Sequence, residues 1–466
     1  MNGIYPDLAL LAQPDRRAIC CLCVESAGKD ISGLLNRKPF SRYDENGLTV
    51  LLCDEAQSET WRAEAERILR ENGLCAGLSG PFALAASARG CLPKARIALE
   101  TGRLVEPGRT LYDMATYSEA ALLRAAKAAL AAQGFCAEDF CDASLAGIAR
   151  LDEQEQAQYA ASLHAYLDSG LNLRRAAEAL NVHRNTLAYR MRRIEERFAL
   201  DLSDRNTCFE LLFSLWLREG IGREKRTENT EPFDREAVRT ALWRFAERAG
   251  SGKAEERPFS LSVAAVGARS LSDAKRTELM LALCGLPQNP VAAFDDETLF
   301  FALPPESVAA FVQQAQRLCE TAHAGLVISQ PFAFERLSAR LRLCRFALLA
   351  AGTSAVRMQD IGSTLFFMAL ERKLSLAPYL CEDVIRVMDE DATRSSTLSR
   401  SLYAYLLNFM DLKKAAQQLG IHRNTLEYQV RKMNGLIGGQ PDGKKRFMMM
   451  CTYKMLALPD AGVYEL

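Results

Sequence analysis

Short apolar runs and amphipathic stretches alternate along the first part of the chain, and the same order returns in the second half. Apolar runs of strand length predict buried strands, whereas apolar residues recurring at i, i+3, i+4 and i+7 predict helices. The predicted strands cover residues 18–24, 48–53, 75–79, 259–266, 298–303 and 324–329. The predicted helices cover residues 59–71, 93–99, 117–132, 307–320 and 333–351. This order predicts small sheets with helices packed on them.

A purely helical pattern follows each mixed segment. In the first copy, two apolar stripes with helical spacing are separated by a short break. The stripes are formed by Leu173, Ala176, Ala177 and Leu180, and by Leu187, Met191, Ile194 and Phe198. Asn181 stands at the break, where a turn favours a residue that tolerates the left-handed conformation, and Gly420 has this place in the second copy. Two helices joined by such a turn predict a helix-turn-helix.

The helix-turn-helix pattern belongs to a long internal repeat. Its sharpest part is identical at six of eight positions, at an offset of 239 residues. The matching segments are 182–189 with 421–428, 162–167 with 401–406 and, more weakly, 76–82 with 324–332. Because the order of features is the same in both halves, we interpret the chain as a duplication with copies at about 1–220 and 232–466.

The predicted fold class is α+β: a tandem duplication of a small α/β domain followed by an all-α helix-turn-helix domain. Between the copies lies a polar, charged segment with glycine and proline, which is typical of a linker. The predicted parts are an α/β domain at 1–145, a helix-turn-helix domain at 146–219, a linker at 220–235, an α/β domain at 236–385 and a helix-turn-helix domain at 386–466.

A polar and basic face of the second predicted helix points away from its apolar stripe. In a helix-turn-helix, first-turn side chains reach base edges and basic residues meet phosphates. Arginine pairs with guanine and asparagine with adenine, while hydroxyl groups donate to phosphate oxygens. The predicted DNA-binding residues are His183, Arg184, Asn185, Thr186, Tyr189, Arg190, Arg192 and Arg193, and in the second copy His422, Arg423, Asn424, Thr425, Tyr428, Arg431 and Lys432. For the two histidines, a capping or packing role is an equal alternative.

The two segments share the core HRNTLxY, within LDSGLNLRRAAEALNVHRNTLAYRMRRIEE and YLLNFMDLKKAAQQLGIHRNTLEYQVRKMN. They resemble the C-terminal helix-turn-helix of the PucR/CdaR family of bacterial regulators. The stretch from AGLSGPF through KARIALETG resembles the degenerate GGDEF-like domain that precedes this helix-turn-helix in CdaR-type members. The resemblance implies promoter DNA as the partner of the helix-turn-helix, and a separate N-terminal domain that senses a small molecule.

Three departures from the family pattern bear on function. From the sequence we expect no separate sensor domain ahead of the first α/β segment, which leaves the effector open. After the HRNTL leucine, where the family more often has arginine, the copies have Ala188 and Glu427, and Gln429 stands where the first copy has Arg190. An outward carboxylate repels phosphate unless it accepts from a cytosine amino group. We therefore expect the first copy to bind DNA more strongly, and the second to read a different half-site or mainly to position the first.

Positive charge is local in this sequence. The 58 Lys and Arg residues balance the 58 Asp and Glu residues, which argues against a basic field over the whole surface. Residues 171–197 hold seven basic and three acidic residues, a balance of +4, and residues 410–436 hold five and two, a balance of +3. This local excess favours a confined DNA-binding element.

Other classes of protein fit less well. With no apolar run long enough for a membrane span and no signal peptide, we expect a cytoplasmic protein. The 14 cysteines are predicted to be buried free thiols, and no metal site is predicted. A nucleotide cyclase would need metal-binding carboxylates at a glycine-rich hairpin. The hairpin positions here are YDENG and FDDET, whose acids we interpret as ordinary strand-turn residues: Asp44, Glu45, Asp295 and Asp296. We expect neither catalysis nor a cofactor.

One alternative function stays open at this point: a non-catalytic dimerisation, interaction or ligand-sensing module in which one or both helix-turn-helices are vestigial. The expected partner is double-stranded DNA, with a small-molecule effector or a sensor partner as a further candidate and no membrane. The duplication allows a homodimer or an intramolecular pseudo-dimer, whose helix-turn-helices would occupy successive major grooves about 34 Å apart.

Overall fold

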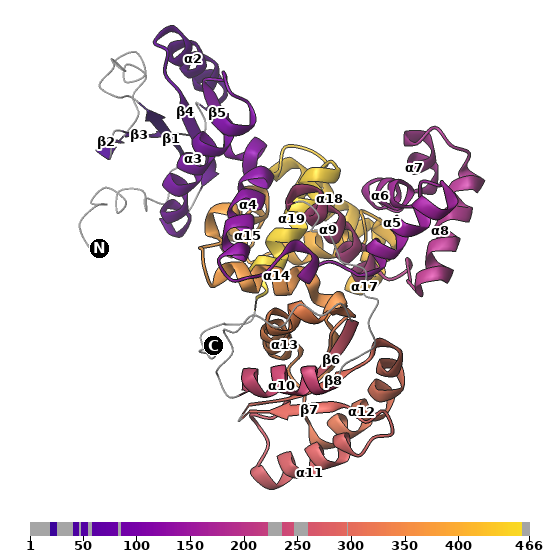
Figure 1. Ribbon diagram of the computed structural model, residues 1–466. Helices are drawn as coiled ribbons and strands as arrows, with labels where there is room; N and C mark the ends of the chain where they lie inside the picture. Colours follow the sequence, from indigo (N-terminus) through magenta and orange to yellow (C-terminus); the bar gives the residue numbers. More distant parts are fainter. Residues whose placement is uncertain are drawn as a thin grey trace. The chain divides into compact units, whose positions relative to one another are not determined.

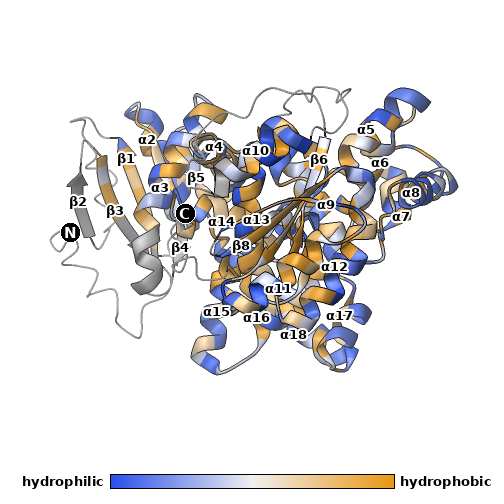
Figure 2. Cartoon of the chain, turned by 60° about the horizontal axis from the view of Figure 1, so that its bottom comes forward, coloured by the Kyte–Doolittle hydropathy of each residue, from blue (hydrophilic) through white to orange (hydrophobic). Residues whose placement is uncertain are grey.

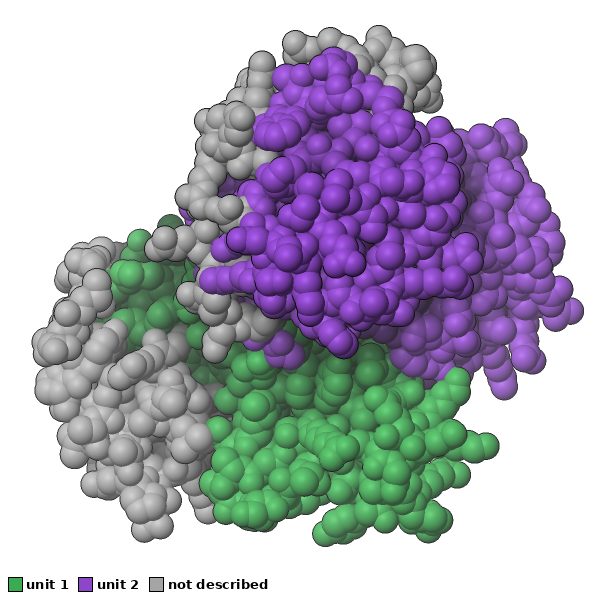
Figure 3. All heavy atoms as spheres, turned by 90° about the horizontal axis from the view of Figure 1, so that it is seen from below, with its two compact units in different colours: residues 1–126, 374–456 green, residues 127–373, 457–466 purple. Residues whose placement is uncertain are grey.

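The structure is a computed structural model (Figure 1). It describes residues 19–25, 41–45, 48–54, 58–82, 85–221, 235–246, 260–295 and 297–458. The chain divides into two compact units (Figure 3). Unit 1 comprises residues 1–126 and 374–456, and unit 2 comprises residues 127–373 and 457–466. Among the described helices, none is both long and apolar enough to cross a bilayer.

The α/β part of unit 1 is built on a sheet with the strand order β2-β3-β1-β4-β5. Its strands are β1 (Ile19–Glu25), β2 (Ser41–Glu45), β3 (Leu48–Asp54), β4 (Ala76–Phe82) and β5 (Leu111–Asp113). The helices are α2 (Ser58–Glu71), α3 (Ala85–Val105) and α4 (Met114–Ala131). β1 pairs antiparallel with β3 and β4, whereas β5 adds parallel to β4. The three strands predicted in this half are confirmed as β1, β3 and β4, with β4 ending later than predicted.

Strand β1 is apolar from Ile19 to Val24, and both of its faces are covered. Side chains alternate along a strand, so Leu22 packs with Trp61 of α2 on one face. On the other face, Cys21 packs with Ala95 of α3. A Cβ at Gly77 of β4 would clash with the carbonyl oxygen of Ala95, so α3 lies directly against the sheet. A strand buried on both faces gives a continuous apolar run in the sequence.

The α/β part of unit 2 repeats this order, as β7-β8-β6-β9-β11, with β10 paired to β6. Its strands are β6 (Ser260–Gly267), β7 (Val291–Phe294), β8 (Thr298–Leu303), β9 (Leu326–Ile328), β10 (Phe332–Ala333) and β11 (Ala355–Arg357). Its helices are α10 (Arg235–Ala246), α11 (Asp273–Cys284), α12 (Val308–Ala322), α13 (Leu337–Ala351) and α14 (Gly362–Glu371). Figure 2 shows the strands around β8 in the colour of hydrophobic residues, as expected for a sheet covered by helices.

Two buried serines mark equivalent positions in the two sheets. The hydroxyl of Ser79 accepts the backbone N–H of Cys21 at 3.0 Å, and that of Ser329 accepts the N–H of Val263 at 2.8 Å. The second copy has two more residues between its AGL sequence and this serine. The weaker sequence match in this strand is therefore shifted by two residues in the structure, while the shared strand order supports the duplication.

Each helical part contains helices in the same order. In unit 2 these are α5 (Ser144–Glu155), α6 (Tyr159–Asp168), α7 (Leu173–Ala179), α8 (Arg184–Phe198) and α9 (Arg205–Ile221). In unit 1 they are α15 (Glu382–Arg394), α16 (Leu398–Leu407), α17 (Leu412–Leu419), α18 (Arg423–Leu436) and α19 (Gly443–Leu456). A short 3-10 helix precedes each set, η3 (Ala137–Asp139) and η7 (Ala377–Tyr379).

The two repeats exchange partners within the units: each unit combines the α/β part of one repeat with the helical part of the other. In unit 2, the ring of Phe213 on α9 lies 5.3 Å from Phe366 and 5.9 Å from Phe367 on α14, measured between centroids. The buried carboxylate of Glu210 accepts from the backbone N–H and the hydroxyl of Ser363, at 2.8 and 2.6 Å. The predicted domain ranges remain predictions, and residues 222–234 of the predicted linker lie outside the described residues.

Candidate nucleic-acid interface

The first helix-turn-helix consists of α7 and α8. Asn172 caps α7, because its side-chain oxygen accepts the N–H groups of Arg174 and Arg175 at 3.0 and 3.1 Å. The turn passes through Asn181, whose φ of 53° is left-handed. Gly420 has the matching place between α17 and α18, with a φ of 68°. Both left-handed positions were predicted from the sequence, and the structure confirms them.

Helices α8 and α18 each begin with a histidine cap. The Nδ1 atom of His183 accepts the N–H of Asn185 at 3.2 Å, and Nδ1 of His422 accepts the N–H of Asn424 at the same distance. An accepting Nδ1 carries no proton, so the proton of the neutral ring is on Nε2. The structure therefore assigns the capping role to both histidines. This cap fixes the first turn in which the predicted base-contacting residues lie.

The predicted inner face of α8 is buried. Leu187 and Ile194 are fully buried and Met191 nearly so, against the equally buried Ala176 and Ala177 of α7. The opposite face is exposed and includes most of the predicted contact residues. These exposed residues are His183, Arg184, Asn185, Thr186, Tyr189 and Arg192. Tyr189 is 57% exposed, which is unusual for a large aromatic residue and suits a contact surface.

Two predicted contact residues of the first copy lie at the flank of this face and bind neighbouring helices. Arg190 donates to the hydroxyl of Ser162 on α6 at 2.9 Å. Arg193 pairs with Glu155 of α5 at 2.5 Å, and its hydrogen bond lowers the pKa of that carboxyl. Both arginines thus hold α8 against the helices behind it, and their role in DNA binding remains a prediction.

The second copy keeps the geometry but pairs more of its basic residues. The exposed residues of its first turns are His422, Arg423, Asn424, Thr425 and Tyr428, with Tyr428 70% exposed. Arg431 donates to Glu427 at 2.7 Å, and Lys432 pairs with Glu390 at 3.0 Å. Gln429, which replaces the arginine of the first copy, accepts from Ser401 at 2.9 Å. Of the three predicted basic contacts of α18, Arg423 alone is without a recorded ion pair in the described part of the chain.

Sequence reasoning missed a further group of basic residues, at the start of the first helix of each motif. Arg175, Lys413 and Lys414 are exposed there, next to the backbone N–H groups that Asn172 and Asp411 cap. The first helix of a helix-turn-helix crosses the DNA backbone, which makes these residues candidates for phosphate contacts. The signal was present in the sequence as a cap residue followed by two basic residues at the same position in both copies.

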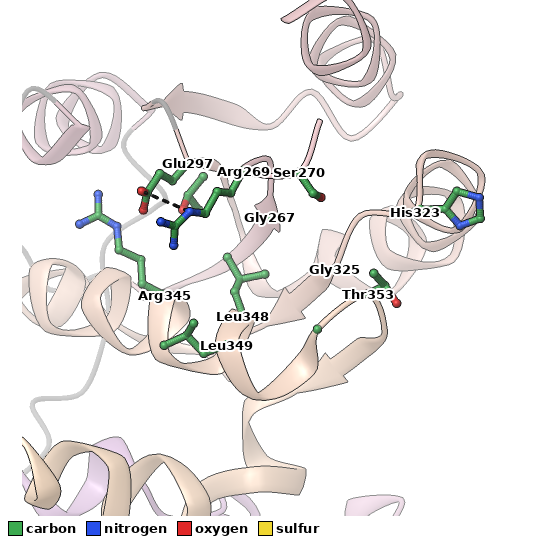
Figure 4. Close-up of a pocket in the computed structure, with 12 residues that line it drawn as sticks. Gly267, Arg269, Ser270, Glu297, His323, Gly325, Arg345, Leu348, Leu349 and Thr353 are labelled. Carbon is green, nitrogen blue, oxygen red and sulfur yellow. Dashed lines mark ion pairs between the residues drawn. The ribbon is translucent and has the colours of Figure 1, made fainter. Parts of the chain in front are cut away.

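The α/β part of unit 2 has a cavity of about 330 Å³ beside the β7–β8 hairpin (Figure 4). The Asp295 carboxylate accepts the N–H groups of Glu297 and Thr298 at 2.8 and 2.7 Å and also pairs with Arg345. Glu297 lies 3.9 Å from Arg269, and both residues line the cavity. Asp295 thus accepts backbone N–H groups of its own hairpin and pairs with Arg345 of α13, in agreement with its interpretation as a strand-turn residue. The side chains of the other predicted hairpin acids are outside the described part: Asp44, Glu45 and Asp296.

The described cysteines are all free, and most of them are buried; Cys284 is exposed. His164 lies 3.4 Å from Glu219, and His323 ends α12 in a left-handed conformation. Among the described residues, no group of three or more histidine, cysteine or acidic side chains is arranged to hold a metal ion.

The fold and the cap geometry define a protein with two helix-turn-helix domains. The profile of the PucR C-terminal helix-turn-helix domain matches the chain twice, at residues 159–217 and 398–450. Both helical parts therefore carry the PucR-type domain, and the chain is a distant homologue of PucR-family regulators.

Two curated proteins of Bacillus subtilis (strain 168) are similar to part of the chain. The proline-responsive transcriptional activator PutR is 34% identical over 73 residues, and the DNA-binding transcriptional activator AdeR is 31% identical over 75 residues. Each match covers 16% of this chain and only 18% of the relative's length. A crystal structure of a regulator of polyketide synthase expression from Bifidobacterium adolescentis aligns with 50% of this chain and 96% of its own, at 16% identity and a TM-score of 0.22. That score is too low for a comparison of folds.

Proposed function

We propose that this protein is a sequence-specific DNA-binding transcriptional regulator that uses both PucR-type helix-turn-helices. The observation that carries the proposal is the repeated, capped first turn of α8 and α18, in which an arginine and an asparagine are exposed side by side. These two side chains have the geometry for paired hydrogen bonds to guanine and adenine in the major groove. The named relatives PutR and AdeR, described as transcriptional activators, support the same class of function.

In the proposed complex, the start of each recognition helix enters the major groove. Arg184 and Asn185 contact base edges, while Thr186 and Tyr189 donate to phosphate oxygens. The positive end of the helix dipole favours nearby phosphates. Arg192 is exposed one turn further along and adds a backbone contact. On its recognition helix, the first copy thereby has more basic residues without an ion pair among the described residues than the second copy has, which supports stronger binding by α8.

We also propose that the α/β parts are degenerate, non-catalytic GGDEF-like domains that hold the two helix-turn-helices in one chain. Support comes from the common strand order of the two sheets and from the use of Asp295 inside its own hairpin. The exchange of partners between repeats supports a pseudo-dimer made by a single polypeptide. Two recognition helices in one chain suit two half-sites about one helical turn of DNA apart.

An electrophoretic mobility shift with the full chain and the DNA upstream of its own gene tests the proposal. Combined replacement of Arg184, Asn185, Arg423 and Asn424 by alanine removes the base-contacting pairs of both copies, and we expect at least about 100-fold weaker specific binding. Lys275→Ala is the matched control, because this exposed lysine lies on α11 in the α/β part. A shift that survives the four replacements, or that is no stronger than on scrambled DNA, contradicts the proposal.

A further inference from the structure

Each recognition helix is bonded at two positions to the helices behind it. In the first copy these positions are Arg190 and Arg193, which lie three residues apart and therefore on one flank of α8, beside α5 and α6 (Figure 1). The repeat offset of 239 residues places Gln429 and Lys432 at the same positions of α18. All four residues are half-buried, whereas the first turns of both helices are exposed.

The first of these positions binds an equivalent buried serine in both copies. Nη1 of Arg190 donates to the hydroxyl of Ser162 on α6 at 2.9 Å, and Oε1 of Gln429 accepts from the hydroxyl of Ser401 on α16 at the same distance. The two serines are related by the same offset of 239, and both are buried. A glutamine side chain carries no charge. The feature that the copies share at this position is therefore the hydrogen bond to the serine, and not a positive charge.

The second position binds a carboxylate on the first helix of the helical part in both copies. Arg193 pairs with Glu155 of α5 at 2.5 Å, and Lys432 pairs with Glu390 of α15 at 3.0 Å. The two acids are not equivalent, because Glu390 lies four residues before Arg394, the residue at the position of Glu155. Each copy thus makes the same contact through an acid one helical turn away from that of the other copy.

These contacts can fix the rotation of a recognition helix about its own axis. The apolar face of α8, with Leu187 and Ile194 fully buried, holds the helix against the domain, but hydrophobic contact is non-directional. Hydrogen bonds depend on direction, and two of them to two different helices restrict rotation and tilt. Binding residues such as Arg184 and Asn185 work only when they are held within about 0.5 Å of the productive geometry. The flank contacts therefore bear directly on how the first turn is presented.

We propose that Arg190 and Arg193 of α8, like Gln429 and Lys432 of α18, are positioning residues, which orient the recognition helix through its neighbours and make no contact with DNA. The proposal rests on the proposed function, because it concerns how the DNA-reading side chains are presented, whereas the contacts themselves exist without DNA. It assigns the guanidinium of Arg190 to Ser162 and not to a phosphate.

Two replacements of Arg190 in the full chain separate positioning from phosphate binding. Arg190→Gln introduces the residue of the second copy, which keeps a hydrogen bond to Ser162 and removes the charge. Arg190→Met removes both, while Ser162 keeps its own bond to the carbonyl oxygen of Gln158 at 2.5 Å. We expect Arg190→Gln to retain operator affinity within about twofold and Arg190→Met to weaken it about three- to tenfold, the contribution of one hydrogen bond.

The salt dependence of binding gives the second readout. Mobility shifts on operator and scrambled DNA at several salt concentrations should show the same slope of log affinity against log salt for both Arg190 variants and the parent chain. Arg192→Gln is the matched comparison, because Arg192 is exposed and should lose about one phosphate contact from the slope. Equal losses in Arg190→Gln and Arg190→Met with a shallower slope, or parent-like operator affinity in Arg190→Met, overturn the proposal.

A charge exchange tests the second position. Arg193→Glu should weaken operator binding, and the addition of Glu155→Arg should restore most of it, because the pair forms again with its charges exchanged. A phosphate contact by Arg193 would not be restored in this way, so a double variant as weak as Arg193→Glu overturns the role of this position.

Hydrogen exchange without DNA tests the contacts themselves. The amides of α8 should exchange faster in Arg190→Met than in Arg190→Gln, and equal rates overturn the orienting contact. Failure of the proposed function is distinguishable from this result. The parent chain would then show no preference for operator over scrambled DNA, while the two Arg190 variants would still differ in the exchange of α8.

Discussion

The two helix-turn-helices of this chain have the same scaffold and different outer faces. Both recognition helices begin with a histidine whose Nδ1 accepts an N–H at 3.2 Å, and both turns pass through a left-handed residue. The outer faces differ in charge where α8 has Ala188 and α18 has Glu427. Glu427 pairs with Arg431 at 2.7 Å, whereas Arg192, the equivalent of Arg431, is exposed without a recorded ion pair among the described residues. The two copies therefore share the cap and turn residues that fold the motif, and they differ in exposed residues that would face DNA.

The largest expected effect on DNA binding comes from replacing the base-contacting arginines of the two copies. Arg184→Ala should weaken operator binding roughly 10- to 100-fold, the cost of one bidentate contact to guanine. Arg423→Ala should weaken operator binding clearly less, because we expect α18 to contribute less to DNA binding than α8. Quantitative mobility shifts at fixed salt measure both variants, with Lys275→Ala as the control. Equal losses for the two arginines would remove the asymmetry between the copies.

A smaller effect on DNA binding is expected at the position where the copies have Ala188 and Glu427. Glu427→Ala frees Arg431 and should strengthen DNA binding about three- to tenfold, with a steeper dependence on salt by about one phosphate contact. The reciprocal change, Ala188→Glu, should weaken the first copy because the new carboxylate can pair with Arg192 four residues away. The slope of log affinity against log salt concentration is the measurement. A slope that stays the same in both variants speaks against the role of this residue.

The scaffold that the copies share should respond equally in both. His183→Ala and His422→Ala each remove a helix cap, which costs about 1 kcal/mol. Since each unit contains several parts, native-state hydrogen exchange at the first turns of α8 and α18 is a better measure than global unfolding. His183→Asn and His422→Asn are the controls, because asparagine keeps a cap acceptor. Protection lost in one copy only would show that the caps are not equivalent.

The sequence predicted the local structure of the motif well, because caps, turns and helical stripes depend on neighbouring residues. The left-handed turn at Asn181 and the buried stripe with Leu187 followed from residue type and spacing alone. Strands β5 and β11 were missed because each has three residues, too few for a period to show. The inward partners of Arg190 and Arg193 were missed because they lie on other helices.

The exchange of partners between the repeats could not be predicted from the sequence. An apolar helix face shows that it will be buried and does not show against which copy. The contact of Phe213 with Phe366 joins residues more than 150 positions apart, and the two copies carry similar apolar patterns. The ion pair of Lys94 with Glu382 could not be predicted for the same reason, since the two residues meet only after this exchange. Long-range packing therefore decides the features through which the two copies differ most.

The smallest expected effect is a pH dependence confined to the first copy. The hydrogen bond from Arg193 lowers the pKa of Glu155 in the folded chain, and a second one from Tyr159 acts in the same direction. A carboxyl group with a lowered folded-state pKa stabilises the fold above its unfolded-state pKa, and this contribution is lost as the pH falls through the folded-state value. The second copy has Arg394 at the position of Glu155, and Lys432 of α18 pairs with Glu390 of α15 instead.

Glu155→Gln should therefore reduce the protection of α8 slightly at pH 7, and this reduction should shrink towards pH 3 as the pH falls through the lowered folded-state pKa of Glu155. Protection of α18 should not change at either pH. The pair is exposed at the surface, where solvent screening keeps such contributions small. Hydrogen exchange of the two helices at both pH values measures the difference. An equal loss at pH 3 and pH 7 would show that the glutamine perturbs packing, and that the charge of Glu155 does not stabilise α8.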